Sequence, residues 1–262
     1  MRPILRYHGG KWKIAQWIIS HFPKHRIYVE PYGGAASVLL QKERCYAEIY
    51  NELDGEIVNV FRCMQYRGKE LKKILTATSF SRREFLNAYK PGGANLERAR
   101  KTIIKSFMGY GSDSIRRKSG FRNDAMRSGT TPAHDWKNYA DCLDFLIERL
   151  RSVVIESLPA LEIIDRFDSP ETLFYIDPPY LHSLRSGISN EAYRYEMTDR
   201  DHRELAEKLK QCKGRVIISG YGSDLYNELY AGWDNDSKMT HADGARERIE
   251  SIWMNFRINK LF

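Results

Sequence analysis

The sequence lacks any apolar run that approaches the roughly 18 residues of a membrane-spanning helix. Its first six residues also lack the long apolar stretch of a signal peptide. These two absences favour a cytoplasmic protein that has no membrane as a partner.

Closely spaced cysteines and phosphate-binding motifs are also missing. The four cysteines, Cys45, Cys63, Cys142 and Cys212, are too far apart in sequence for a zinc knuckle or a redox Cys-x-x-Cys motif. We therefore predict reduced thiols without catalytic chemistry, and no bound metal. Neither a Gly-x-Gly-x-x-Gly fingerprint nor a Gly-Lys-Ser/Thr P-loop occurs, which argues against a nucleotide held through its phosphates.

Positive charge is in excess, because 42 Lys and Arg stand against 34 Asp and Glu, a net charge of +8. Such an excess favours an acidic partner such as nucleic acid. Nearly all of it lies between residues 98 and 127, where nine basic residues accompany only Asp113 and Asp124. The candidates for contacts with DNA in this stretch are Lys105, Arg116, Arg117, Lys118, Arg122 and Arg127.

Strand-like and helix-like segments alternate at both ends of the chain, which predicts an α/β fold with a Rossmann-like sheet. Thr198-Asp199-Arg200-Asp201 resembles a capping box that opens a helix. Other helices are expected at 54–66, at 160–167 and from Val38 onward. Strands are expected at 27–30, 46–50, 153–155, 173–176 and 215–219, with a last strand in which Ile252, Met254 and Phe256 alternate.

Residues 67–150 have a different character. Apolar spacing predicts helices over 82–108 and near 138–150, whereas 109–134 combines glycines with basic residues and favours a loop. No strand pattern is strong here. We therefore predict an α/β domain made of residues 1–66 and 151–262, interrupted by a mostly helical insertion of residues 67–150.

The tetrapeptide Asp177-Pro178-Pro179-Tyr180 follows a predicted buried strand, at the sheet edge where open α/β proteins bind ligands. Its two prolines stiffen the loop and remove two N–H donors, so that its carbonyl groups face outward as acceptors. Asp177 and the Pro178 carbonyl can accept both hydrogens of an exocyclic amine, and Tyr180 can stack on the ring. The motif predicts a site for an aromatic amine nucleophile. The alternative is a proline-rich turn without chemistry.

A second motif, Tyr28 to Ser37, follows the first predicted strand, and its small residues allow a ligand to approach the backbone. Glu52, after the second strand, is placed like the acid that binds ribose hydroxyls in dinucleotide folds. The alternative for Glu52 is a solvated turn acid. A cofactor with a ribose but no phosphate fits these features, and S-adenosyl-L-methionine (AdoMet) is such a cofactor.

In this order and spacing, the motifs resemble the Dam-like (alpha-group) DNA adenine N6-methyltransferases over nearly the whole chain. Tyr7-His8-Gly9-Gly10-Lys11 resembles the family's Trp-x-Gly-Gly-Lys, residues 30–37 resemble its Glu-Pro-Phe-x-Gly-x-Gly-Ser, and Asp177-Pro178-Pro179-Tyr180 matches without change. The resemblance implies catalytic roles for Asp177, Pro178 and Tyr180, a target-recognition role for the insertion, and a mixed sheet whose final strand is antiparallel. It implies that AdoMet is bound by Tyr7, Lys11, Glu30, Pro31, Gly33, Gly34, Ser37, Glu52 and Asp177.

Four positions depart from the family pattern. Tyr7 replaces Trp, and Glu52 replaces Asp. Ala36 replaces the second Gly, which adds a methyl group near the expected cofactor. Pro159 lies where many relatives have an acid near the cofactor adenine. None of these changes removes a group that the reaction must have, and all of them bear on the affinity for AdoMet.

The resemblance implies transfer of the AdoMet methyl group to N6 of an adenine that is flipped out of double-stranded DNA. We expect a bacterial or phage-encoded enzyme that is a monomer or weak dimer and needs no metal. Two alternatives stay open. One is methylation of another planar amine, such as cytosine N4, RNA guanine N2 or a protein glutamine amide. The other is a DNA-binding module with a catalytically silent methyltransferase fold.

Overall fold

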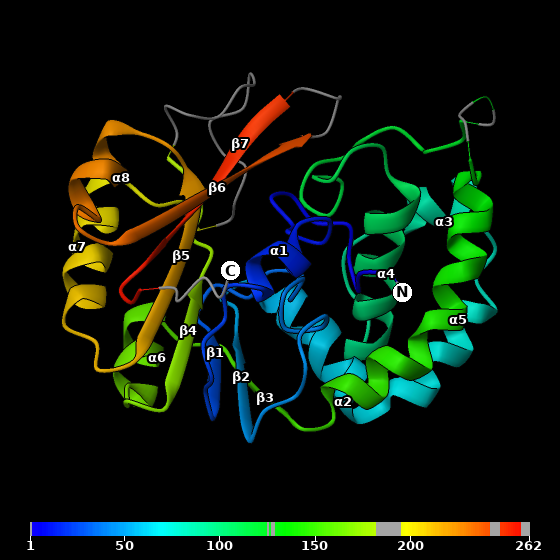
Figure 1. Cartoon of the computed structure of the whole chain (residues 1–262). Helices are drawn as coiled ribbons and strands as arrows, with labels where there is room; N and C mark the ends of the chain where they lie inside the picture. The colour runs from blue at the N-terminus through cyan, green and yellow to red at the C-terminus, as the bar shows by residue number, and fades with distance from the viewer. Residues whose placement is uncertain (1, 125, 127–128, 182–194, 242–246, 258–262) are drawn as a thin grey trace.

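The computed structural model describes residues 2–124, 126, 129–181, 195–241 and 247–257. Its centre is a seven-stranded sheet in the order β3-β2-β1-β4-β5-β7-β6 (Figure 1). The strands are β1 (Ile27–Glu30), β2 (Ala47–Asn51), β3 (Val153–Glu156), β4 (Thr172–Ile176), β5 (Arg215–Tyr221), β6 (Asp234–His241) and β7 (Glu247–Met254).

Strands β1 to β5 run parallel, whereas β7 runs antiparallel to both β5 and β6. The Rossmann-like fold and the antiparallel final strand are therefore confirmed. The chain order reverses between β1 and β4, and this switch point is where open α/β sheets form a ligand crevice. The sequence gives no signal for β6, because Asp234–His241 is mostly polar.

Both faces of the sheet are buried. On β1, Tyr28 packs into the core on one face and the next residue, Val29, into the core on the other. Leu173 and Phe174 of β4 divide in the same way. Figure 1 shows α1 (Ala15–Ile19) and α2 (Gly55–Thr76) on the first face, and α6 (Ala160–Phe167), α7 (Asp199–Lys210) and α8 (Asp224–Leu229) on the second.

The remaining helices, α3 (Arg82–Asn87), α4 (Asn95–Met108) and α5 (Pro132–Leu150), form a helical cluster beside α2 (Figure 1). Helix α2 runs from the α/β domain into this cluster and kinks at Arg67. The domain boundary predicted after residue 66 falls at this kink, inside one helix, so the division into two domains stays a prediction. No helix in the described ranges is long and apolar enough to span a membrane.

The capping box at Thr198 is confirmed. The Thr198 hydroxyl accepts a hydrogen bond from the Asp201 amide, and the Asp201 carboxylate accepts one from the Thr198 amide at 2.7 Å. This reciprocal pair satisfies two amides at the start of α7 that the helix itself leaves unbonded.

Other helix predictions need correction. The helix predicted over 82–108 is two helices, because Pro91-Gly92-Gly93 separates α3 from α4 and both glycines have positive φ. Helix α5 begins at Pro132, well before 138, because Thr131 caps it and proline suits the first helical position. No helix begins at Val38. Ala36, at φ 52°, lies in the left-handed region, and the described chain forms turns there.

Candidate active site

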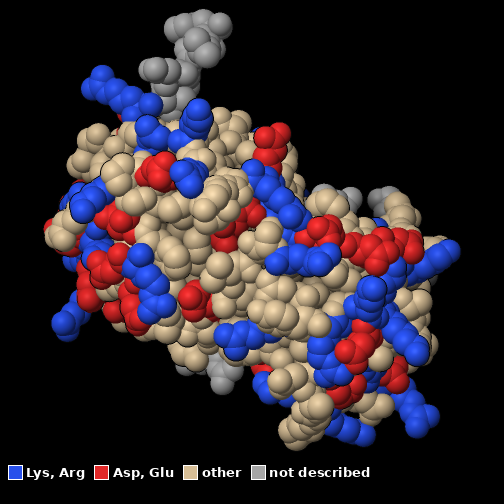
Figure 2. Space-filling model, turned by 90° about the horizontal axis from the view of Figure 1, so that it is seen from below, with Lys and Arg blue, Asp and Glu red and all other residues tan. Residues whose placement is uncertain are grey.

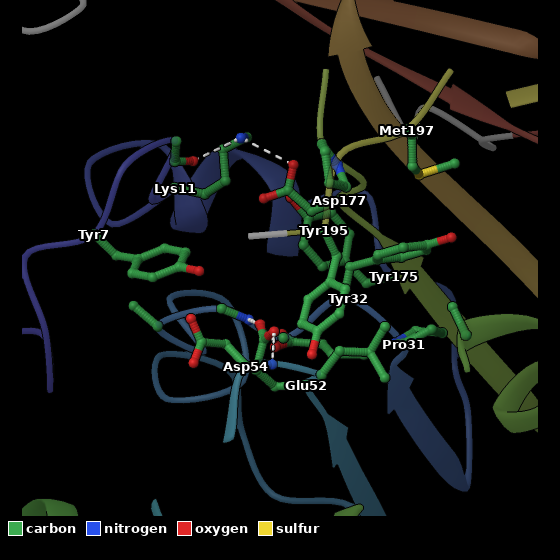
Figure 3. A pocket seen from close by; sticks show the side chains of 18 of the residues that line it. Tyr7, Lys11, Pro31, Tyr32, Glu52, Asp54, Tyr175, Asp177, Tyr195 and Met197 are labelled. Atoms are coloured by element: carbon green, nitrogen blue, oxygen red, sulfur yellow. Dashed lines mark hydrogen bonds and ion pairs between the residues drawn. The ribbon is translucent and has the colours of Figure 1, made fainter. Parts of the chain in front are cut away.

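A pocket of about 320 Å³ opens at the carboxyl ends of β1, β2 and β4, at the switch point of the sheet. Figure 3 shows Lys11 and Asp177 paired at one end of this pocket, with Glu52 and Asp54 at another. The lining includes every residue that the sequence predicts to bind the cofactor, namely Tyr7, Lys11, Glu30, Pro31, Gly33, Gly34, Ser37, Glu52 and Asp177.

The turn that follows β1 is held tightly against β2. The Gly33 amide donates to the Asn51 carbonyl at 2.8 Å, and the Tyr50 hydroxyl donates to the Gly34 carbonyl at 2.6 Å. Gly34 has φ +48°, and a Cβ added there would lie 3.2 Å from the ring of Tyr7. The small residues in this motif therefore let two aromatic side chains and the backbone approach one another, which shapes one wall of the pocket.

The Glu52 carboxylate holds the backbone at two places, in addition to any role toward a ligand. One of its carboxylate oxygens accepts from the Gly34 amide, and the other accepts from the Asp54 amide, each at 2.9 Å. Burial raises the pKa of Glu52, and these two backbone hydrogen bonds act in the opposite direction. Since a carboxylate oxygen can accept more than one hydrogen bond, the same group can also receive hydroxyl donors from within the pocket.

Glu30 lies at the base of the pocket with only 2% of its surface exposed. Its Oε1 atom accepts hydrogen bonds from the Tyr28 hydroxyl and the Leu39 amide, both at 2.7 Å. Burial raises the pKa of Glu30 to about 8, because these bonds only partly offset the loss of hydration. The carboxyl group is therefore mostly protonated at neutral pH in the protein without ligand.

Two of the departures from the family pattern have clear positions. Ala36 is fully buried and packs into the core, and it is not among the residues that line the pocket. The expectation that its methyl group lies near the cofactor is therefore not supported. The cost of alanine at this position is backbone strain, because Ala36 adopts a left-handed conformation that glycine adopts more readily. Pro159 lines the pocket directly, at the start of α6.

Asp177 is positioned by two donors that meet at one of its oxygens. Lys11 Nζ lies 2.9 Å from Oδ1, and the Ser219 hydroxyl of β5 donates to the same atom at 2.9 Å. Tyr175 in turn lies 3.1 Å from the Ser219 hydroxyl. Within the described residues, these bonds leave Oδ2 as the oxygen that can accept from a ligand.

The other residues of the tetrapeptide differ in exposure. Pro179 lines the pocket, whereas Pro178 is buried and does not. Tyr180 is 7% exposed and also lies outside the lining. Its ring lies under the Lys11 ammonium, 4.5 Å from the centroid, and its hydroxyl donates to Glu250. The roles of the Pro178 carbonyl and the Tyr180 ring toward a substrate stay predictions.

The charge of the pocket favours a cationic ligand. Lys11 is opposed by seven carboxyl residues in the lining: Glu30, Glu52, Asp54, Asp177, Glu196, Asp201 and Glu204. AdoMet fits this set, because it carries a sulfonium and an ammonium group, a ribose and a flat purine ring. Pro31, Pro159 and Met197 supply apolar walls. Among the described residues, no group of three or more His, Cys, Asp or Glu is arranged to hold a metal ion.

A family model for the D12 class of N6 adenine-specific DNA methyltransferases matches residues 7–244. The chain belongs to this family. The activity of this D12-class enzyme is therefore AdoMet-dependent methylation of adenine N6 in DNA. The family assignment favours it over the other planar amines, and over a catalytically silent module.

Named relatives of the enzyme are distant but cover most of its length. The type II methyltransferase M.MjaIII of Methanocaldococcus jannaschii is 22% identical, over 89% of this chain and 89% of that protein. The DNA adenine methylase of Vibrio cholerae is 22% identical over 88% of this chain and 85% of its own length. The DNA adenine methylase of Haemophilus influenzae is 22% identical over 88% and 83%.

The predicted DNA-contacting residues of the D12-class enzyme fall into different environments. Arg117 and Lys118 are exposed and Arg116 is half-buried, all in the loop after α4. Burial lowers the pKa of Lys105, whose ammonium lies over the Tyr89 ring. Arg127 lies outside the described residues.

Arg122 has a structural partner. Its side chain is 11% exposed and pairs with Asp135 of α5 at 2.9 Å, which argues against a DNA contact by this residue. Arg98 and Arg100 pair likewise with acids outside the basic stretch or at its border: Glu56, Glu84 and Glu97. The charge excess counted along the sequence is therefore partly neutralised in space. On the face in Figure 2, basic and acidic side chains are interspersed.

The exposed basic loop borders the mouth of the pocket. Its residue Asp113 interacts electrostatically with His8, and His8 lines the pocket. The Arg6 side chain donates to the Gly109 carbonyl, which ties the start of the same loop to the N-terminal segment. Figure 1 shows this loop and the β6–β7 hairpin at the same end of the molecule.

Several pocket residues were missed by sequence reasoning. Tyr32, Asp54 and Met197 line the pocket, and Glu250 lies just behind it. A signal for Glu250 was present, because the alternation of Ile252 and Met254 extends back to this position on the same face of β7. Tyr32 lies within the motif from Tyr28 to Ser37 but was not singled out, whereas nothing near Met197 marks it as part of a site.

Proposed function

We propose that the acidic pocket of this adenine methyltransferase is its AdoMet site. The observation that carries this proposal is the enclosure of one lysine among seven carboxyl residues at the sheet's switch point. Glu52 would bind the ribose hydroxyls, and Tyr7 and Pro31 would enclose the cofactor. The positive charge of AdoMet would favour loss of the proton that Glu30 carries in the protein without ligand. When bound, AdoMet supplies an activated methyl group.

We further propose that the target adenine is held beside Asp177. The Oδ2 atom of Asp177 and the carbonyl of Pro178 would each accept one N6 hydrogen, which orients the nitrogen lone pair toward the cofactor side of the pocket. Tyr180 would stack on the purine. An adenine inside a duplex cannot reach these groups, so the base must leave the stack. The protein then acts mainly by positioning two reactants.

We propose that DNA crosses the pocket mouth and contacts the exposed loop after α4. Arg116, Arg117 and Lys118 are consecutive basic residues of that loop, and the last two are exposed to solvent. Arg117 pairs with Asp113 at 3.5 Å, with about half of its side chain exposed, so a phosphate can compete with this pair.

The proposal is tested by labelled methyl transfer from AdoMet to unmethylated DNA, followed by nucleoside analysis. Wild type should form N6-methyladenine, with unchanged yield when EDTA is present. Asp177→Ala should stay folded and lose activity by roughly 100-fold or more, because an acceptor for the nucleophile is gone. Normal turnover by a folded Asp177→Ala variant would contradict the assignment of the base site.

A further inference from the structure

Glu250 connects the last antiparallel strand to the catalytic tetrapeptide. It lies on β7 opposite Tyr221 of β5, and only 3% of it is exposed. Its Oε1 atom accepts the Tyr180 hydroxyl and lies 3.5 Å from Lys11 Nζ. One buried carboxylate oxygen therefore meets two residues that lie far apart in the sequence.

The ammonium group of Lys11 is already engaged by acceptors of the protein itself. Its ammonium donates to the Gly9 carbonyl at 2.8 Å, pairs with Asp177 at 2.9 Å and faces Glu250. An ammonium has three N–H donors, and these three acceptors can engage all of them. Lys11 is therefore placed to act through Asp177.

In addition to the hydrogen bond of its hydroxyl, the ring of Tyr180 is held by contacts with two other side chains. The Lys11 ammonium covers its ring, and the ring of Tyr221 meets it in an edge arrangement, with 4.7 Å between the centroids. Arg248 in turn donates to the Tyr221 hydroxyl at 2.9 Å. An aromatic ring anchored in this way loses little freedom when a base stacks on it.

We propose that Glu250 is a positioning residue, which sets the Tyr180 ring and, through Lys11, the Asp177 carboxylate for the target adenine. It touches neither reactant, and its effect passes through the two groups that it holds. The inference rests on the proposed base site at Asp177. Glu250 is separated from the ribose end of the pocket, so its role concerns turnover more than AdoMet affinity.

The test compares Glu250→Gln, Glu250→Ala, Tyr180→Phe and the double variant Glu250→Gln/Tyr180→Phe in the full-length enzyme. Glutamine keeps an acceptor for the tyrosine but removes the charge that faces Lys11. We expect Glu250→Gln to lower kcat by roughly 10- to 100-fold, and to leave the KM and Kd for AdoMet within about twofold of wild type. The fall in kcat of the double variant should be smaller than the product of the two single falls in kcat, because the two residues act as one unit.

Asp236→Asn is the matched control, since it removes a carboxylate from β6 of the same hairpin and lies opposite Ile252, away from the tetrapeptide. It should keep wild-type kcat. Wild-type kcat in a folded Glu250→Gln variant would overturn the inference, and so would purely multiplicative effects in the double variant. If Glu250→Ala does not fold, Glu250→Gln decides alone. Wild-type and Asp177→Ala assays run in parallel separate this result from a failure of the proposed base site.

Discussion

The buried carboxyl of Glu30 makes the stability of this enzyme depend on pH in an unusual direction. Its pKa rises from 4.5 to about 8 on folding. The folded state therefore binds more protons than the unfolded state between these values, and stability falls as pH rises through that window. Ordinary paired carboxylates do the reverse.

Replacement of Glu30 by glutamine removes this dependence. The amide oxygen can accept the same two hydrogen bonds, from the Tyr28 hydroxyl and the Leu39 amide, because both go to a single oxygen. At about 1.4 kcal/mol per pKa unit, wild type loses about 3 kcal/mol of stability between pH 4.5 and pH 7 through Glu30. The stability advantage of the variant over wild type should therefore be about 2–3 kcal/mol larger at pH 7 than at pH 5.

Urea unfolding of both proteins at pH 5, 6, 7 and 8 measures the difference. Glu228→Gln is the control, because Glu228 is exposed and its hydrogen bond from Arg203 lowers its pKa, the opposite direction. Equal pH dependence in Glu30→Gln and wild type would refute the reasoning, since it would mean that Glu30 is charged in the folded state. Since AdoMet is cationic, the stabilised variant should also bind it more weakly, as calorimetry can show.

Three further outcomes are expected. Glu52→Gln should raise the Kd for AdoMet roughly 10- to 100-fold in calorimetry, because one charged acceptor of a ribose hydroxyl is lost and an amide donor faces backbone amides; an unchanged Kd would remove Glu52 from the ribose site. Replacement of Arg116, Arg117 and Lys118 by alanine should weaken DNA binding and reduce the salt slope by about one unit per lost phosphate contact. An unchanged slope would place the loop off the interface. Glu48→Gln should lower the free energy of unfolding by about 3–5 kcal/mol in urea, because the carboxylate is 2% exposed and pairs with two buried basic side chains. A smaller loss would mean that those side chains find other partners.

The sequence by itself determined the parallel strands, the capping box of α7 and the nine motif residues that meet in the pocket. These features depend on local patterns: short apolar runs predict buried strands, and Thr198 with Asp201 satisfies amides of the same helix turn. The residues after strands β1, β2 and β4 meet because the carboxyl ends of parallel strands share one edge. Motif order was therefore enough to place the predicted cofactor-binding residues around one pocket.

Only the tertiary structure decided which polar groups are already engaged. Arg122 is a candidate for DNA contact along the chain, but it pairs with Asp135 of helix α5. Lys11 is predicted from the sequence to bind the cofactor, but Asp177 and Glu250 engage its ammonium group. Glu250 lies on β7, the last strand of the chain. Pairings over such sequence separations follow from strand order and burial, since a buried charge must find a partner wherever the fold supplies one.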